Sequence, residues 1–159
     1  MNGGHPDPIR RIVVGVDGSD GATRAVMWSA RLARATGAEG VAAYAIESPV
    51  FLEDFPIVTG PISMESWDVA WKEWREHTRE LLERRWCRPL AAAGVRYRAE
   101  IITGGSKALI EFAASQEADL IVVGRRGRGG FAELVLGSFS HHLVHHSRTP
   151  VIVVPSAQD

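Results

Sequence analysis

The chain has 159 residues, of which 45% are hydrophobic and 23% charged, and its formal net charge at pH 7 is -1. This length and balance predict one globular domain with a sizeable core and argue against wholesale disorder. The near-neutral charge gives no electrostatic case for binding nucleic acid or an anionic membrane surface, and the single cysteine, Cys87, excludes an intramolecular disulfide.

The chain begins with a polar segment, residues 1–8, which contains two prolines and no apolar run. We predict that it is a disordered tail and that residues 9–155 form the domain. The segment lacks the apolar core of a signal peptide, and no run elsewhere reaches the ~18 apolar residues of a membrane span. We therefore expect a cytoplasmic protein with no membrane contact.

Strands are predicted at five short apolar runs, several rich in valine and isoleucine. The runs are continuous rather than alternating, which is typical of parallel strands that are buried on both faces. They are residues 12–16, 41–46, 97–102, 120–123 and 151–154.

Helical patterns separate the first three strands. Small residues recur at three- and four-residue steps through 22–35, and Gly37 is placed to end that helix. A stripe of tryptophan and leucine runs through 68–93 and predicts core anchors. Pro89 in that stretch predicts a kink near Arg85.

Two serines are predicted N-caps of the later helices. Ser106 precedes the helical pattern of 107–117, and Ser138 precedes a last helix that reaches about residue 147. Strands and helices thus alternate along the chain, and parallel strands require right-handed crossovers. The predicted fold class is α/β, a single doubly wound, Rossmann-like sheet of five parallel strands in the order 3-2-1-4-5.

A glycine-rich cationic loop follows the fourth strand. It reads GRRGRGGFAELVLGS from Gly124 to Ser138. Glycine backbone exposes N–H groups without a Cβ, and a helix N-terminus adds partial positive charge, so the segment suits a phosphate. We expect Arg125, Arg126 and Arg128 either to reach these phosphates or to point to solvent.

The first strand ends in Asp17, and in the predicted strand order it lies beside the glycine-rich loop. Ligands of open α/β sheets bind beyond the carboxyl ends of the strands, where the winding direction reverses. Asp17 either contacts that ligand or caps the following helix. A Walker A loop is excluded because no Gly-Lys-Ser/Thr ends the loop, and a dinucleotide fingerprint is excluded because the first strand lacks the G-x-G step.

The spacing Gly124-x2-Gly127-x9-Gly137-Ser138 resembles the G-x2-G-x9-G-S/T signature of the nucleotide-binding universal stress proteins. The segments IVVGVDGS at 12–19, ADLIVVG at 118–124 and TPVIVV at 149–154 extend the resemblance over nearly the whole chain. The family is usually dimeric and regulatory and binds ATP or cyclic AMP.

The resemblance implies roles for individual residues. Asp17 would meet the adenosine and the backbone near Ala45 the adenine. Gly124 and Gly127 would line ribose and phosphate. N–H groups would be donated to phosphates by Gly137, Ser138 and Phe139. Tyr44, where many relatives carry His, and the proline-bearing segment 47–66 depart from the family pattern and bear on the base pocket.

Three classes of function compete. We favour an adenine-nucleotide-binding regulatory protein, with ATP (with or without Mg²⁺) ahead of cyclic AMP. Asp17 and Glu133 alone offer carboxylates near the loop, so at most slow ATP hydrolysis is expected. The second class is an adenylate-chemistry enzyme on a related sheet, such as the ATP pyrophosphatases. Those enzymes carry a Ser-Gly-Gly-x-Asp-Ser loop after the first strand, and residues 17–21 do not match it.

The third class is an interaction protein without ligand. The resemblance suggests that the edge strand 151–154 pairs with a second subunit, so we predict a homodimer. The pairs His141/His145 and His142/His146 have chelating spacing, but no Asp, Glu or Cys joins them, so no metal site is predicted.

Overall fold

The computed structural model describes residues 8–47, 64–127 and 136–155. The predicted tail 1–8 and the segment 47–66 therefore lie mostly outside the described residues. So does Arg128.

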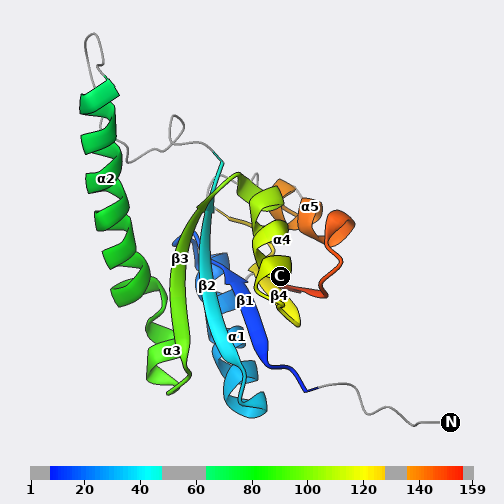
Figure 1. The fold of residues 1–159 in the computed structure, drawn as a ribbon. Helices are drawn as coiled ribbons and strands as arrows, with labels where there is room; N and C mark the ends of the chain where they lie inside the picture. The colour runs from blue at the N-terminus through cyan, green and yellow to red at the C-terminus, as the bar shows by residue number, and fades with distance from the viewer. Residues whose placement is uncertain (1–7, 48–63, 128–135, 156–159) are drawn as a thin grey trace, which may run out of the picture.

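One parallel sheet forms the centre of the molecule (Figure 1), and its strand order is β3-β2-β1-β4-β5. Every neighbouring pair is parallel. This confirms the predicted fold class and order. The strands are β1 (Arg11–Gly15), β2 (Glu39–Ile46), β3 (Tyr97–Thr103), β4 (Leu120–Gly124) and β5 (Val151–Val154).

Helices cover both faces of the sheet (Figure 1). On one face lie α1 (Asp20–Thr36), α2 (Met64–Leu81) and α3 (Arg88–Ala92); on the other lie α4 (Gly105–Ser115) and α5 (Ser138–His146). Successive residues of β1 alternate between the two cores: Val14 packs with α1, and Val13 packs with Leu109 of α4. Both faces of the central strands are thus buried, which explains their continuous apolar sequence.

The start and end of α1 follow from two local interactions. The Ser19 hydroxyl accepts the N–H of Ala22 at 3.1 Å, so Ser19 is the N-cap. Gly37 adopts φ 76° and its N–H donates to the carbonyl of Ala33 at 2.8 Å. The predicted end is confirmed, and the helix begins two residues earlier than predicted.

The predicted helix 68–93 is present with its interruption near Arg85, but it divides there into separate helices. It begins at Met64 and is interrupted by a π-helical turn, Leu82–Trp86, before α3. Pro89 has no N–H for the carbonyl four residues earlier, which explains the break near the predicted Arg85. Cys87 lies buried at this junction, and burial raises its pKa to about 12, so its thiol stays protonated at neutral pH.

Both predicted serine N-caps are wrong. Gly104, with φ 121°, precedes α4, and Ser106 lies inside its first turn. Gly137 precedes α5 in an extended conformation, and Ser138 is the first residue of that helix. Neither helix has a side-chain cap hydrogen bond. Serine is favoured at caps by sequence statistics. At α4 the turn instead requires the positive φ of Gly104, which a serine rarely adopts, whereas the extended conformation of Gly137 before α5 is open to any residue.

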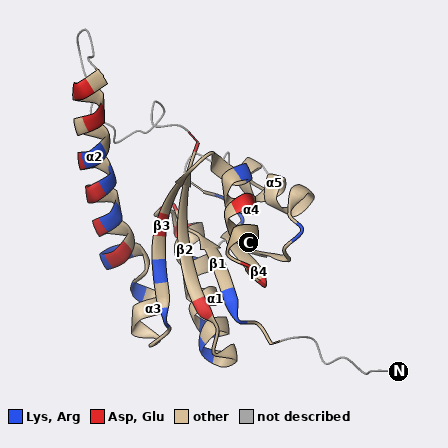
Figure 2. Ribbon diagram, viewed as in Figure 1, with Lys and Arg blue, Asp and Glu red and all other residues tan. Residues whose placement is uncertain are grey.

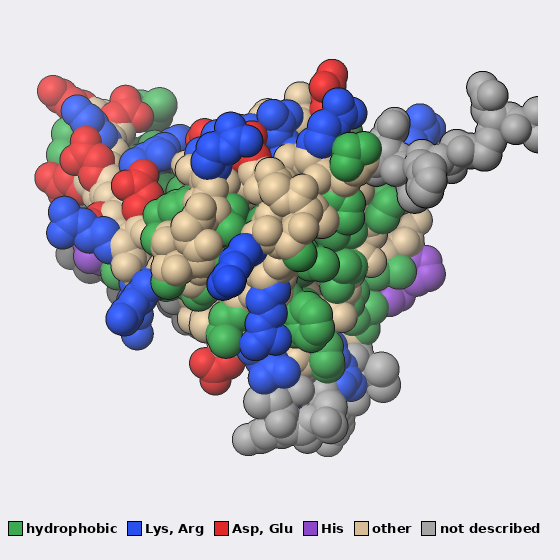
Figure 3. Space-filling model, turned by 90° about the horizontal axis from the view of Figure 1, so that it is seen from below, with side chains coloured by type: hydrophobic (Ala, Val, Ile, Leu, Met, Phe, Trp, Pro, Cys, Tyr) green, Lys and Arg blue, Asp and Glu red, His purple; other side chains and the backbone are tan. Residues whose placement is uncertain are grey.

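Charged side chains lie on the surface of α2 and at the amino-terminal ends of the strands, which form the lower end of the sheet in Figure 2. Lys and Arg alternate with Asp and Glu along α2 (Figure 2). Arg84 of the π-helical turn lies 3.2 Å from Glu80 of α2, an exposed pair of small energetic value. Basic side chains also gather on the face seen from below (Figure 3). Arg11 and Arg98 each contact Glu39, at 3.2 and 3.4 Å.

Asp119 joins β1 to β4 at this lower end of the sheet. Its carboxylate accepts the N–H groups of Arg10 and Arg11 at 2.7 and 2.9 Å. Partial burial raises the pKa of Asp119, but these backbone hydrogen bonds outweigh it and lower the pKa below its ordinary value.

We predict that Ser29→Ala stabilises the protein by about 1 kcal/mol. Ser29 is fully buried in α1 and its hydroxyl has no hydrogen-bond partner, so the substitution removes an uncompensated desolvation cost. The control is Ser140→Ala, because the buried Ser140 hydroxyl donates to the Gly124 carbonyl at 2.7 Å and its loss is destabilising. Urea denaturation measures both; equal destabilisation by the two variants would contradict the prediction.

Candidate functional site

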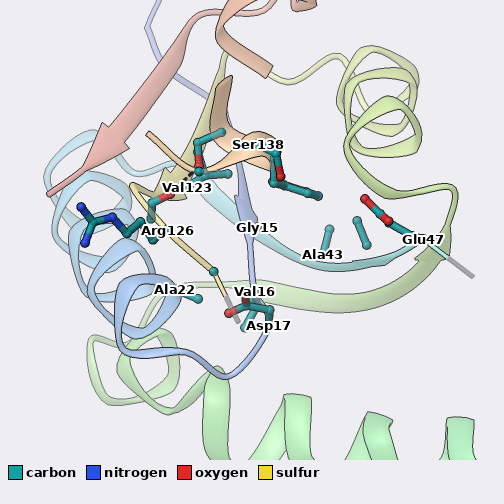
Figure 4. Close-up of a pocket in the computed structure, with 15 residues that line it drawn as sticks. Gly15, Val16, Asp17, Ala22, Ala43, Glu47, Val123, Arg126 and Ser138 are labelled. Carbon is teal, nitrogen blue, oxygen red and sulfur yellow. Dashed lines mark hydrogen bonds between the residues drawn. The ribbon is translucent and has the colours of Figure 1, made fainter. Parts of the chain in front are cut away.

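A cavity of about 340 Å³ opens at the carboxyl ends of β1, β2 and β4, between the starts of α1 and α5 (Figure 4). This is the edge at which ligands of open α/β sheets bind, and its volume lies within the range of small-ligand sites. It is lined by Gly15, Val16, Asp17, Ala22, Ala43, Ala45, Glu47, Val123, Gly124, Arg126, Gly127, Gly137, Ser138, Phe139 and Ser140.

Most of the predicted ligand residues line this one cavity, although they come from segments more than one hundred positions apart. They are Asp17, Ala45, Gly124, Gly127, Gly137, Ser138 and Phe139. The cavity lining includes Arg126 but does not include the predicted Arg125. Their roles in binding remain predictions.

The backbone explains why Arg126 lines the cavity and Arg125 does not. The N–H of Arg125 donates to the carbonyl of Val154 at 2.8 Å, so Arg125 still pairs with β5. Its carbonyl accepts the N–H of Gly137 at 3.0 Å, which closes the loop. The N–H of Gly137, predicted to meet phosphate, is therefore already used inside the protein.

The start of α5 offers the strongest anion-binding geometry. The first N–H groups of a helix lack partners within that helix, and the helix dipole places partial positive charge there. In α5 these groups belong to Ser138 and Phe139, both in the cavity wall. The Ser140 hydroxyl ties this turn to the end of β4.

The opposite wall depends on a close backbone contact between α1 and the β4 loop. A Cβ on Gly21 would overlap the carbonyl oxygen of Arg126, and a Cβ on Gly124 would overlap the backbone of Gly21. Both positions thus need glycine for space rather than for a special φ angle. This contact sets the distance between the first turn of α1 and the loop that carries Arg126 and Gly127.

Asp17 lies between β1 and α1 and faces the loop. One carboxylate oxygen accepts the N–H of Ser19 at 2.9 Å, so Asp17 shapes the turn while Ser19 caps the helix. A Cβ on Gly127 would overlap the other carboxylate oxygen of Asp17. The two predicted ligand residues are therefore in direct contact.

Strand parity places Tyr44 away from the cavity. Ala43 and Ala45 line it, whereas the Tyr44 ring contacts Trp86 edge-on at 5.4 Å and Trp74 at 6.3 Å on the opposite face. The expectation that Tyr44 bears on the base pocket is wrong, because successive residues of a strand point to opposite faces. The same cluster confirms Trp74 as a core residue.

Comparison with known proteins assigns this architecture to a family. The profile of the Universal stress protein family matches residues 8–155. The chain belongs to the universal stress protein family. Universal stress protein Slr1101 of Synechocystis sp. is 35% identical over 105 residues, which cover 65% of this chain and 96% of that protein.

Solved structures of universal stress proteins share the fold. UspA from Lactobacillus plantarum superposes with a TM-score of 0.72 at 21% identity, covering 94% of this chain and 99% of that one. A universal stress protein solved in complex with cAMP superposes with a TM-score of 0.59 at 26% identity, covering 93% of this chain and 98% of that one.

One charged residue of this universal stress protein's cavity, Glu47, was not predicted. Arg126 was expected, together with Arg125 and Arg128, either to reach phosphates or to point to solvent, and sequence alone does not tell which of the adjacent arginines lines the cavity. Glu47 follows β2, and the alternation from Ala43 through Ala45 to Glu47 was the signal that could have found it. The other unpredicted lining residues are small or apolar, apart from Ser140.

The histidines of α5 form two close pairs. Ring centroids lie 4.3 Å apart for His141 and His145 and 4.1 Å for His142 and His146. Among the described residues, no three or more His, Cys, Asp or Glu side chains are grouped to hold a metal ion. No helix in the described ranges is both long and apolar enough to cross a membrane.

We predict that Gly21→Ala destabilises the protein by about 1–3 kcal/mol. Alanine is the better helix former by about 1 kcal/mol, but its Cβ would overlap the Arg126 carbonyl, and the backbone contact must then open. The control is Gly94→Ala, where a Cβ meets nothing within 4 Å and only the φ of 68° is unfavourable. Thermal and urea unfolding compare the variants; a more stable Gly21→Ala protein would contradict the contact.

Proposed function

We propose that this universal stress protein binds an adenine nucleotide, with ATP favoured, in the cavity at the carboxyl edge of the sheet, and that the bound state serves regulation. The observation that carries the proposal is the convergence of Asp17, the glycine-rich loop and the start of α5 on one cavity. That arrangement supplies N–H donors and partial positive charge for phosphates, with small apolar side chains beside them.

The phosphates are placed between the end of β4 and α5. Ser138 and Phe139 offer helix N-terminal N–H groups, and the Ser138 hydroxyl adds a donor. Arg126 also lines the cavity, but its guanidinium points away from it (Figure 4), so it is a donor only after a change of side-chain conformation. Gly124 and Gly127 let the ligand approach the backbone. Arg125 and Arg128, predicted from the sequence to contact phosphates, are secondary candidates. Arg125 is the weaker candidate of the two because it does not line the cavity.

The adenosine is placed over β2 and β1. Ala43 and Ala45 present a flat apolar surface with strand backbone beside it, and Asp17 borders it. The 26% identical universal stress protein solved with cAMP supports an adenine ligand. Backbone N–H donors accept the phosphates of ATP and of cyclic AMP, so cyclic AMP is the second candidate.

The cavity favours binding over catalysis. Efficient phosphoryl transfer needs a positioned water or nucleophile and usually a set of Mg²⁺ ligands. Among the described residues, the carboxylates in the cavity wall are Asp17 and Glu47, and Asp17 borders the loop. Glu133, the other carboxylate expected near the loop, lies outside the described residues. Any Mg²⁺ would arrive with the nucleotide phosphates. We therefore propose at most slow hydrolysis.

We also propose a cytoplasmic homodimer joined through β5. This strand is an edge of the sheet and Ile152 on it is 37% exposed. An apolar edge strand is a pairing hazard unless it is covered, and a second copy would cover it. A dimer that acts without any ligand is the alternative function that this surface favours.

The first experiment is to denature freshly purified protein and identify released nucleotides by mass spectrometry, beside calorimetric titration with ATP and cyclic AMP. Recovered or tightly titrating ATP supports the proposal. Cyclic AMP alone would replace ATP as the ligand. Neither nucleotide would leave the dimer surface as the functional element.

We predict that Gly127→Val weakens nucleotide binding at least tenfold. The new side chain would overlap the Asp17 carboxylate and occupy the place where backbone approaches the ligand. Titration calorimetry measures the dissociation constant, and circular dichroism verifies folding. Gly94→Ala, remote from the cavity, is expected to bind as wild type. Unchanged binding by folded Gly127→Val would show that the phosphates lie elsewhere.

We predict that Ile152→Lys shifts the protein from dimer to monomer. A lysine in the strand edge places an ammonium where two copies would pair, and unpaired burial of charge is costly. Light scattering after size exclusion measures the mass. Val144→Lys, on α5 and 48% exposed, is the control and should stay dimeric. A wild-type protein that is monomeric at micromolar concentration would refute the dimer.

A further inference from the structure

The cavity has two ends of opposite electrostatic character. The start of α5, with the partial positive charge of a helix N-terminus, lies at the β4 end, and Glu47 lies at the β2 end, with its carboxylate directed into the cavity (Figure 4). β1 separates β2 from β4 in the sheet, so the two ends are about two strand spacings, roughly 10 Å, apart. A ligand whose anion binds at the β4 end thus turns its other end toward Glu47.

A turn from the neighbouring strand makes room for Glu47. Gly104 and Gly105 between β3 and α4 both have positive φ, 121° and 60°. The N–H of Gly104 donates to the carbonyl of Ile46 at 2.7 Å, which fastens the turn to the end of β2. A Cβ on Gly105 would lie 3.0 Å from Cγ of Glu47, so glycine there lets the glutamate stem pass.

The two carboxylates in the cavity wall, those of Asp17 and Glu47, differ in the protein groups that they contact. Asp17 accepts the N–H of Ser19 with one oxygen and borders Gly127 with the other. Glu47 lies at the exposed rim of the cavity, on the same strand face as Ala43 and Ala45. A carboxylate is an acceptor only, so it selects groups that carry N–H or O–H.

We infer that Glu47 is a specificity-determining residue that accepts a hydrogen bond from the nucleoside end of the ligand. This inference rests on the proposed nucleotide site and deepens it. The donor is an exocyclic amine of the base or a ribose hydroxyl, which share the required chemistry. A charged acceptor at this end also disfavours a ligand that would place a second anion there, and so orients the nucleotide.

A purely structural role for Glu47 makes a different prediction. The first turn of α4 contains no acidic residue and its N-cap makes no side-chain hydrogen bond, so a nearby carboxylate could serve that helix terminus. In that case removal of Glu47 lowers thermal stability and leaves the ratio of affinities between ligands unchanged. Ligand selectivity therefore distinguishes the two roles.

The test compares ATP, inosine triphosphate and 2′-deoxy-ATP on wild type, Glu47→Gln and Glu47→Ala by titration calorimetry. Inosine triphosphate lacks the amine and 2′-deoxy-ATP lacks the hydroxyl. Glu47→Ala is expected to lose about tenfold in affinity for ATP and to bind the ligand that lacks the donor as wild type does, since a hydrogen bond to a charged group is worth about that factor. Glu47→Gln keeps an acceptor oxygen and should lie between.

If Glu47→Ala no longer distinguishes ATP from inosine triphosphate, the donor is the amine of the base. If the variant no longer distinguishes ATP from 2′-deoxy-ATP, the donor is the ribose hydroxyl. Unchanged affinity ratios in Glu47→Ala would overturn the inference, as would equal gains for all three ligands, which would mean simple relief of charge repulsion. Glu73→Gln on the exposed surface of α2 is the matched control and should change nothing. Wild-type protein that binds none of the nucleotides refutes the proposed function and this inference with it, whereas wild-type binding with unchanged ratios refutes the inference alone.

Discussion

The site depends on a contact between two pieces of backbone, the first turn of α1 at Gly21 and the chain that leaves β4 at Gly124. Neither residue has a side chain, and a Cβ on either would overlap the other segment. Close-packed backbones leave little room for adjustment, so this contact fixes where the loop with Arg126 and Gly127 begins. The parallel pairing of β1 with β4 brings the two segments together, and the ligand cavity lies beside their junction.

Two hydrogen-bonded ties hold the loop that follows β4. The Gly137 N–H donates to the Arg125 carbonyl, and the Ser140 hydroxyl donates to the Gly124 carbonyl. Both ties fasten the start of α5 to the end of β4, so the helix terminus is preorganised beside the cavity. Preorganised N–H groups bind an anion without first losing conformational freedom, so the entropic cost of binding is smaller.

The cavity also depends on the distribution of side chains over the two faces of β2. Ala43 and Ala45 keep the ligand side shallow, while Tyr44 joins Trp74 and Trp86 on the opposite face. Bulk is thus confined to the core beneath α2 and the π-helical turn, and small side chains are kept at the ligand edge. Glu47 directly follows the same strand and gives the cavity its acidic end. One strand therefore contributes side chains both to the core and to the cavity wall.

The sequence by itself determined the sheet order, the family and the place of the loop. The strands can be predicted from sequence because both of their faces are buried, which makes their sequences continuously apolar. The loop can be predicted from the spacing of Gly124, Gly127 and Gly137 because each of these positions needs space or access to its backbone. Only the tertiary structure decided which of the adjacent arginines lines the cavity and which N–H groups remain available there. Arg126 rather than Arg125 lines the cavity because Arg125 pairs with β5, and the Gly137 N–H is used in closing the loop. These contacts join separate elements of the fold, so no local pattern encodes them, whereas the alternation along β2 could have indicated Glu47.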